Sequence, residues 1–264
     1  MSNLKNYPNA GAFHTGPAPA VIETAGGHAG QTVDSSGGAS SLHGPWTMKA
    51  FVAVVLVVWL AGVIFLGAQG AFVSPIGTPP IPIAIGVAAP LIVFFVAFWL
   101  SRAFRRFVTN ADVRLVAAIE AWRWAGFGFI SLYAYGVLPG RFAWPAGLGD
   151  MAIGFTAPWI VLALVRRPSF VASRLFVIWN LLGILDLVVA VSIAALIQSR
   201  ATGAVGEATV TPMAQLPLLF IPAYLVPLFV MLHVTALIQA RRTAQPTQRR
   251  LSHRPQHQSN ATAI

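Results

Sequence analysis

The stretch KAFVAVVLVVWLAGVIFLGAQG occupies residues 49–70 and carries one charged side chain, that of Lys49. A helix of about 20 mostly apolar residues can cross the hydrocarbon core of a bilayer, which is about 30 Å thick. Five further stretches of this kind follow, at residues 81–101, 114–137, 146–165, 174–198 and 214–239. No segment alternates apolar and polar residues over about ten positions, as the strands of a membrane barrel do. The sequence therefore predicts an all-α, polytopic membrane bundle with six transmembrane helices.

The composition supports a membrane protein and excludes several other classes. Of the 264 residues, 56% are hydrophobic and 9% are charged, whereas a soluble domain has about 25% charged residues. The chain has no cysteine, which excludes disulfides, thiolate nucleophiles, iron–sulfur clusters and Cys-ligated zinc. The formal charge of +10 does not indicate a nucleic-acid partner, because the basic residues lie at helix ends and in one tail.

The distribution of Lys and Arg predicts which side of the membrane each loop faces. Cytoplasmic flanks collect these residues. With six spans and both termini in the cytoplasm, fourteen Lys and Arg lie inside, and only Arg141 and Arg200 lie outside. The inside residues are Lys5, Lys49, Arg102, Arg105, Arg106, Arg114, Arg166, Arg167, Arg174, Arg241, Arg242, Arg249, Arg250 and Arg254. We expect the bilayer to be a cell membrane, in a bacterium the inner membrane.

The two ends of the chain differ from the apolar region between them. Residues 1–48 are polar and rich in Gly, Ala, Ser and Thr, so we expect a disordered cytoplasmic tail. Its three histidines, at positions 14, 28 and 43, are too widely spaced to indicate a metal site. Residues 241–264 are predicted to form a basic cytoplasmic tail.

The third predicted helix contains an acidic and a basic residue three positions apart, Glu120 and Arg123. At the helical spacing they share one face, and a face of this helix continues through Trp124, Phe127 and Ser131. Charged groups inside a bilayer cost roughly 2.5–3.5 kcal/mol each on insertion scales, and they are usually paired or functional. The pair is therefore either a neutralising ion pair that packs helices or a group coupled to protons or a substrate.

A neighbouring face of this helix has a stripe of small residues, Ala117, Ala121 and Ala125, which would let another helix approach closely. The fifth predicted helix carries Asn180 and Asp186. Asp186 falls near the middle of the bilayer, where a carboxyl group needs either a proton or a cation. Arg123 is its candidate partner, and a structural bridge and a proton-carrying group are both open.

The fourth predicted helix begins after Trp144-Pro145 with the sequence AGLGD, which ends at Asp150. Its glycines and Pro158 make it the weakest of the six predictions. We expect Asp150 on the outer first turn, where a carboxylate favours the helix N-terminus, paired with Arg141 on the same side. The Gly-x-Gly pattern lacks the preceding strand and following Lys of a phosphate loop.

The sixth predicted helix has prolines at 217, 222 and 227, which remove backbone donors and predict a bent helix beside a crevice. Its polar members are Tyr224 and His233. Since His233 is the only membrane-embedded histidine, two axial haem ligands are lacking. The sequence predicts no metal site and no cofactor.

The depth of these residues predicts that they meet. Counted at about 1.5 Å per residue from the cytoplasmic ends, Asp186 lies slightly deeper than the other four residues. These four each lie roughly 8–13 Å into the membrane: Glu120, Arg123, Asn180 and His233. The predicted intramembrane cluster consists of Glu120, Arg123, Asn180, Asp186 and His233.

Two functions fit this pattern. One is a small transporter or permease for a small molecule or ion, with the cluster as its working part. The other is a membrane scaffold, sensor or assembly partner in which the cluster only fixes helix packing. An intramembrane enzyme ranks last, since no Ser–His dyad, His-rich metal box or Asp-x-x-Asp pair occurs. The predicted partners are the lipid bilayer and, for a transporter, a small-molecule or ion substrate, and the sequence does not predict an oligomeric state.

Overall fold

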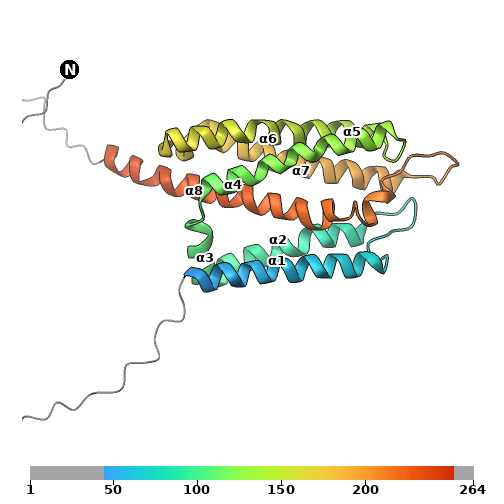
Figure 1. Cartoon of the computed structure of the whole chain (residues 1–264), viewed down its shortest axis with the longest axis horizontal. Coiled ribbons are helices and arrows are strands. Elements are labelled where there is room, and N and C mark those ends of the chain that lie inside the picture. Colours follow the sequence, from blue (N-terminus) through green and yellow to red (C-terminus); the bar gives the residue numbers. More distant parts are fainter. Residues whose placement is uncertain (1–44, 253–264) are drawn as a thin grey trace, which may run out of the picture. The chain divides into compact units, whose positions relative to one another are not determined.

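The computed structural model of the chain describes residues 45–252, and all regular secondary structure in this range is helical (Figure 1). Six helices in the described range are long and apolar enough to cross a membrane: Thr47–Ala68, Ile81–Leu100, Val113–Ala134, Gly140–Arg166, Arg174–Arg200 and Ile221–Ala244. The all-helical class and the six apolar spans are thereby confirmed, and they support a multi-pass membrane protein. The predicted tail 1–48 lies outside the described residues except for its last four, which begin the first helix.

The described range contains twelve helical elements, which form the spans and three of their connections. They are α1 (Pro45–Ala68), α2 (Ile81–Leu100), α3 (Arg102–Thr109), α4 (Val113–Ile119), η1 (Glu120–Gly126), α5 (Phe127–Ala134), α6 (Gly140–Arg166), η2 (Pro168–Ala172), α7 (Arg174–Arg200), η3 (Thr211–Ala214), η4 (Ile221–Leu225) and α8 (Val226–Ser252). The start of α1, the short α3 and the end of α8 lie toward one end of the bundle, and the turn between α5 and α6 lies at the other (Figure 1).

Large apolar side chains cover the outside of the helices. Val58 is 65% exposed, Trp99 76% and Trp122 77%. Monomeric soluble proteins rarely expose contiguous apolar surface beyond a few hundred Å². A surface of this kind fits contact with lipid.

The third span changes its helical period along its length. It starts as α4, tightens into the 3-10 helix η1 and continues as α5. A 3-10 helix has three residues per turn, so residues three apart lie directly above one another. From Ala117 to Phe129 the buried positions follow this period, at Ala117, Glu120, Arg123, Gly126 and Phe129.

The predicted faces of this span were therefore partly wrong. Trp124 and Phe127, expected beside the charged pair, are 50% and 55% exposed. Of the expected alanine stripe, Ala117 is buried, Ala121 is half-buried and Ala125 is exposed. The prediction assumed about 3.6 residues per turn, and the tighter helix turns these positions outward.

Glycines on α6 and on η1 allow these two helices to pack at short range. A Cβ at Gly154 would overlap the backbone of Arg123 and Trp124. A Cβ at Gly126 would overlap the side chain of Asp150. Close approach between helices in membranes relies on small residues of this kind, and here it places η1 directly beside the middle of α6.

The fourth span begins earlier than predicted, at Gly140, with Pro139 before it and Pro145 and Pro158 inside. Asp150 lies ten residues after the start of α6 and is not a first-turn cap, so that prediction was wrong. The prediction placed the start of the helix in the Pro- and Gly-containing sequence before Asp150, because Pro and Gly usually mark the ends of helices. A bilayer penalises a broken backbone, and the helix continues through them.

The sixth span begins later than predicted. Pro212 lies in η3 and Pro217 in the turn that follows, while Pro222 and Pro227 occupy the π-helical start η4 and the first turn of α8. Two of the prolines thus lead into the helix and do not bend it. Helix α8 continues through Ser252, so residues 241–252 extend this helix beyond the predicted start of the tail.

The loop between α7 and η3 is organised around one exposed carboxylate. Glu207 Oε2 accepts hydrogen bonds from the Thr202 hydroxyl at 2.8 Å, the Thr202 amide at 2.8 Å and the Gly203 amide at 2.9 Å. The hydrogen bond from the Thr202 hydroxyl is the largest of the effects that lower the pKa of Glu207.

Candidate functional site

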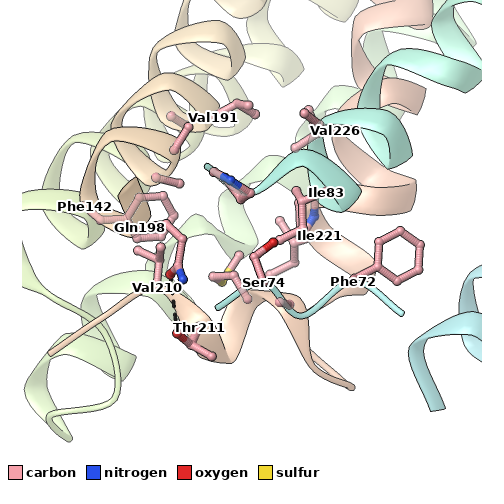
Figure 2. Close-up of a pocket in the computed structure, with 18 of the residues that line it drawn as sticks. Phe72, Ser74, Ile83, Phe142, Val191, Gln198, Val210, Thr211, Ile221 and Val226 are labelled. Atoms are coloured by element: carbon pink, nitrogen blue, oxygen red, sulfur yellow. Dashed lines mark hydrogen bonds between the residues drawn. The ribbon is translucent and has the colours of Figure 1, made fainter. Parts of the chain in front are cut away.

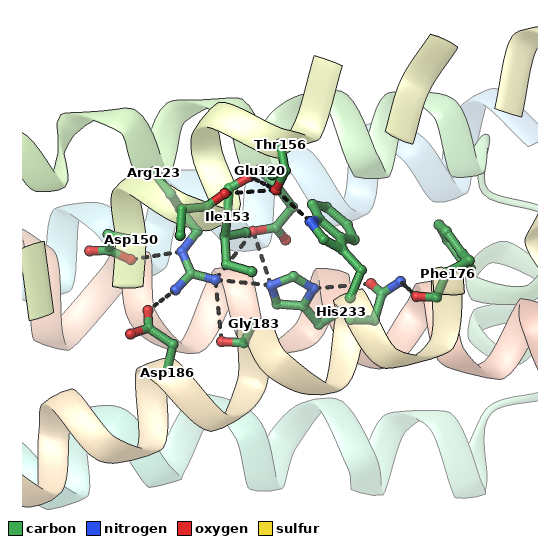
Figure 3. Close-up of polar contacts among 12 residues, drawn as sticks. Glu120, Arg123, Asp150, Ile153, Thr156, Phe176, Gly183, Asp186 and His233 are labelled. Atoms are coloured by element: carbon green, nitrogen blue, oxygen red, sulfur yellow. Dashed lines mark hydrogen bonds and ion pairs between the residues drawn. The ribbon is translucent and has the colours of Figure 1, made fainter. Parts of the chain in front are cut away.

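The guanidinium of Arg123 is the centre of a polar cluster between the helices (Figure 3). Its Nε donates to Asp150 Oδ1 at 2.7 Å, its Nη2 donates to Asp186 Oδ2, and its Nη1 donates to the Gly183 carbonyl at 3.2 Å. The planar fork of arginine carries donors in several fixed directions. One side chain from η1 thereby joins α6 to α7.

His233, on α8, lies on the other side of the Arg123 guanidinium. Its Nε2 lies 3.0 Å from Arg123 Nη1, and its Nδ1 lies 3.0 Å from Asn180 Oδ1. Asn180 Nδ2 donates to the Phe176 carbonyl at 2.8 Å, which orients the amide so that its oxygen faces the imidazole. The imidazole must therefore donate from Nδ1, and Nε2 either accepts from Arg123 or holds a second proton.

The carboxyl group of Glu120 is a second group that can hold the proton described above for His233 Nε2. Its Oε2 lies 3.2 Å from His233 Nε2 and 3.9 Å from Arg123 Nη1. Both contacts are within ion-pair distance, but neither carboxyl oxygen has a hydrogen bond in the described part of the chain. A buried carboxylate without hydrogen bonds is costly. A proton between Glu120 and His233 removes that cost.

Two glycines make room for this arrangement. A Cβ at Gly183 would overlap the imidazole of His233, and a Cβ at Gly149 would overlap the carboxyl group of Asp186. The ring of Trp179 packs edge-on against the His233 ring with centroids 5.6 Å apart. The imidazole is therefore held by packing as well as by hydrogen bonds.

Burial changes across the cluster. Glu120, Arg123, Asn180 and His233 are each at most 2% exposed. The side chains of Asp150 and Asp186 are 17% and 16% exposed. The cluster thus has a closed half and an accessible half, with Arg123 bonded to both.

A cavity adjoins the accessible half of the cluster at Asp150. It has about 830 Å³ of empty space, counted with its open mouth, and Asp150 is one of its lining residues. The second half of α7, the start of α2, the residues around η3 and the start of the sixth span form most of its walls. The polar residues Ser74, Gln198 and Thr211 lie at the end formed by the loops (Figure 2).

The structure brings together the five residues that the sequence placed in one cluster, from the third, fifth and sixth spans. It adds Asp150 from the fourth span, which the sequence assigned to a helix cap. Arg141, its expected partner, is exposed on the first turn of α6, and nine steps along the α-helix, at about 1.5 Å each, separate the two by roughly 13 Å.

Other polar residues serve elsewhere. Tyr224 donates to the Leu56 carbonyl at 3.4 Å and joins the sixth span to α1. Among the residues that the structure describes, no group of three His, Asp or Glu side chains is placed to hold a metal ion.

Comparison with known families places the cluster within a shared domain. Residues 80–241, more than half of the chain, match the model of a domain of unknown function, DUF8737. The chain belongs to the DUF8737 family. The matched segment runs from the residue before α2 into α8 and holds all six cluster residues, whereas α1 and Ser74 precede it. No curated protein and no solved structure matches the chain.

Proposed function

We propose that this protein is a small permease-like transporter of a cell membrane, in which the cavity admits a small molecule and the polar cluster exchanges a proton. The charge balance of the cluster carries this proposal. Arg123 contributes +1, and Glu120, Asp150 and Asp186 contribute −3, so the fully ionised cluster with neutral His233 has a charge of −2.

An excess of two negative charges is costly in a membrane interior, where the penalty for each unpaired ion amounts to several kcal/mol. Protons or a bound cation remove the excess. A cluster that only packs helices would be expected to balance its charges. Surplus carboxylates are instead typical of groups that take up and release protons in transporters.

The position of Asp150 supports a link between the proton and a ligand. It accepts a hydrogen bond from Arg123, and it also lines the cavity. Arg123 in turn contacts the closed half, where Glu120 and His233 lie. A ligand at Asp150 would therefore change the electrostatic potential at Glu120 and His233 in the closed half.

We further propose that both chain termini face the cytoplasm, which places the loop end of the cavity on the outside. The support is the concentration of Arg at one end of the spans, as at Arg106 and Arg174. Because the natural chain has no cysteine, single cysteines report sidedness without background. An impermeant maleimide added to whole cells should label Ala204→Cys and leave Asn110→Cys unlabelled, and the reverse pattern would refute the orientation.

Transport is tested with purified protein in liposomes that contain a pH-sensitive dye. We expect a compound from a broad screen to drive proton movement, and Glu120→Gln and Asp186→Asn to abolish it. Glu207→Gln removes a carboxylate outside the cluster and should leave the flux unchanged. Equal flux from all three variants, or no active compound across the screen, would contradict the proposal.

A second function, as a scaffold or sensor, is favoured by one observation. The closed half is at most 2% exposed and Arg123 is bonded on several sides, as a purely structural tie between helices would be. In that case Glu120→Gln would change stability and leave every ligand response intact.

A further inference from the structure

The charge of the cavity wall restricts what the cavity can bind. Asp150 is the one charged residue among the described lining residues, and no Lys, Arg or His lines the space. Arg123 donates to Oδ1 of this carboxylate, which leaves Oδ2 for a second donor. An anionic ligand would meet this carboxylate and no cation on the cavity wall, because Arg123 does not line the space, whereas a cationic ligand would find a partner at Asp150.

The uncharged part of the wall defines the rest of the ligand. Side chains such as Ile83, Leu187, Val191, Ile221 and Val226 form apolar walls. Apolar walls with a few convergent polar groups are typical of small-molecule sites. The ligand should therefore have an apolar body.

An unsatisfied hydroxyl marks the loop end of the cavity. Ser74 is 9% exposed, its Oγ has no hydrogen-bond partner within the described structure, and it lines the cavity. Close by, Gln198 Oε1 accepts a hydrogen bond from Thr211 at 3.4 Å. A buried hydroxyl without a partner loses the hydrogen bonds that it makes in water, and a polar group on a ligand would restore one.

We propose that the cavity binds an amphipathic organic amine, with its ammonium group at Asp150 and its apolar body along α7. This proposal rests on the proposed function, because it names the class of molecule that the permease would carry. The ammonium donates a charge-assisted hydrogen bond to the carboxylate, and it offsets one unit of the negative excess of the cluster.

Three probes of matched shape test the class of ligand: cyclohexylmethylamine, cyclohexylmethanol and cyclohexanecarboxylate. Binding is measured on the full chain in nanodiscs of zwitterionic lipid by the shift in thermal unfolding, with empty nanodiscs as the blank. We expect the amine to bind at least about tenfold more tightly than the alcohol, as one charge-assisted hydrogen bond would give, and the carboxylate to bind weakest. Carboxylate binding equal to or tighter than amine binding would overturn the proposal.

Variants locate the site. Asp150→Asn should remove the preference for the amine over the alcohol. Val191→Phe should fill the cavity and abolish binding, whereas Val189→Phe, two residues away on the outer surface of α7 and 40% exposed, should not. If Asp150→Asn does not fold, the Val191 and Val189 pair decides: equal binding by these two variants would overturn the proposal.

The two proposals fail in different ways. Amine binding without amine-driven proton movement in liposomes would leave the binding site intact and refute transport. Proton movement driven by another class of compound, without amine binding, would refute the ligand and leave transport intact.

Discussion

Removal of the Arg123 side chain should destabilise the protein more than the loss of any exposed arginine. Replacement with Met keeps the length and apolar volume of the side chain but removes every donor. The change breaks two hydrogen bonds to carboxylates and one to the Gly183 carbonyl. At about 1.5–3 kcal/mol for each charged bond and about 1 kcal/mol for the neutral one, the gross loss is about 4–7 kcal/mol.

Relaxation reduces this figure. Loss of one partner from a buried ion pair typically costs about 3–5 kcal/mol, because the remaining carboxylates can take up protons. We therefore expect Arg123→Met to lower the free energy of unfolding by about 3–5 kcal/mol. Unfolding in mixed micelles with rising dodecyl sulfate content, followed by tryptophan fluorescence, measures the change. Arg141→Met, on the exposed first turn of α6, should stay within about 0.5 kcal/mol of wild type.

A triple variant separates charge from packing. Arg123→Met combined with Asp150→Asn and Asp186→Asn removes the guanidinium together with the two carboxylates bonded to it. Since an ion cluster can often be replaced by uncharged residues at little cost, most of the loss should be recovered. A triple variant less stable than the single variant, or a single variant that loses less than about 1 kcal/mol, would refute the view that uncompensated charge causes the loss.

Two further predictions concern helix packing and the loop that contains Glu207. Gly154→Ala should lower the free energy of unfolding by about 1–3 kcal/mol in the same assay, because its Cβ overlaps the backbone of η1. Gly128→Ala, where a Cβ meets nothing within 4 Å, should not, and equal losses would contradict the close approach. Because the pKa of Glu207 is lowered from 4.5, the ordering of its loop should be complete above that pH and lost as the pH falls through the lowered value. A titration of the Gly203 amide resonance should have its midpoint below 4.5, Glu207→Gln should abolish it, and a midpoint at or above 4.5 would show that the carboxylate is not stabilised.

Hydropathy and charge were sufficient to predict the spans and much of the cluster. A backbone in lipid must satisfy its own hydrogen bonds, so long apolar stretches have few alternatives to helices. The same constraint fixes the depth of each polar residue, which is why Arg123, Asp186 and His233 could be matched before any contact was known.

Asp150 could not be predicted because local signals pointed elsewhere. Trp144-Pro145 followed by Gly-x-Gly is typical of a helix boundary, and a carboxylate at such a boundary is usually a cap. In the structure α6 starts earlier, and its glycines serve packing between helices. The sequence did not distinguish these two roles of glycine, since both place small residues next to a charge.

The two halves of the cluster depend on each other through one cation. Arg123 contacts Asp150 and Asp186 on the accessible side and His233 on the closed side. An ammonium at Asp150 and a proton at Glu120 or His233 each offset the same negative excess. Binding of either therefore weakens binding of the other, and this coupling is reciprocal. On these proposals, release of a proton from the closed half strengthens amine binding at Asp150, which favours exchange of an amine for a proton across the membrane.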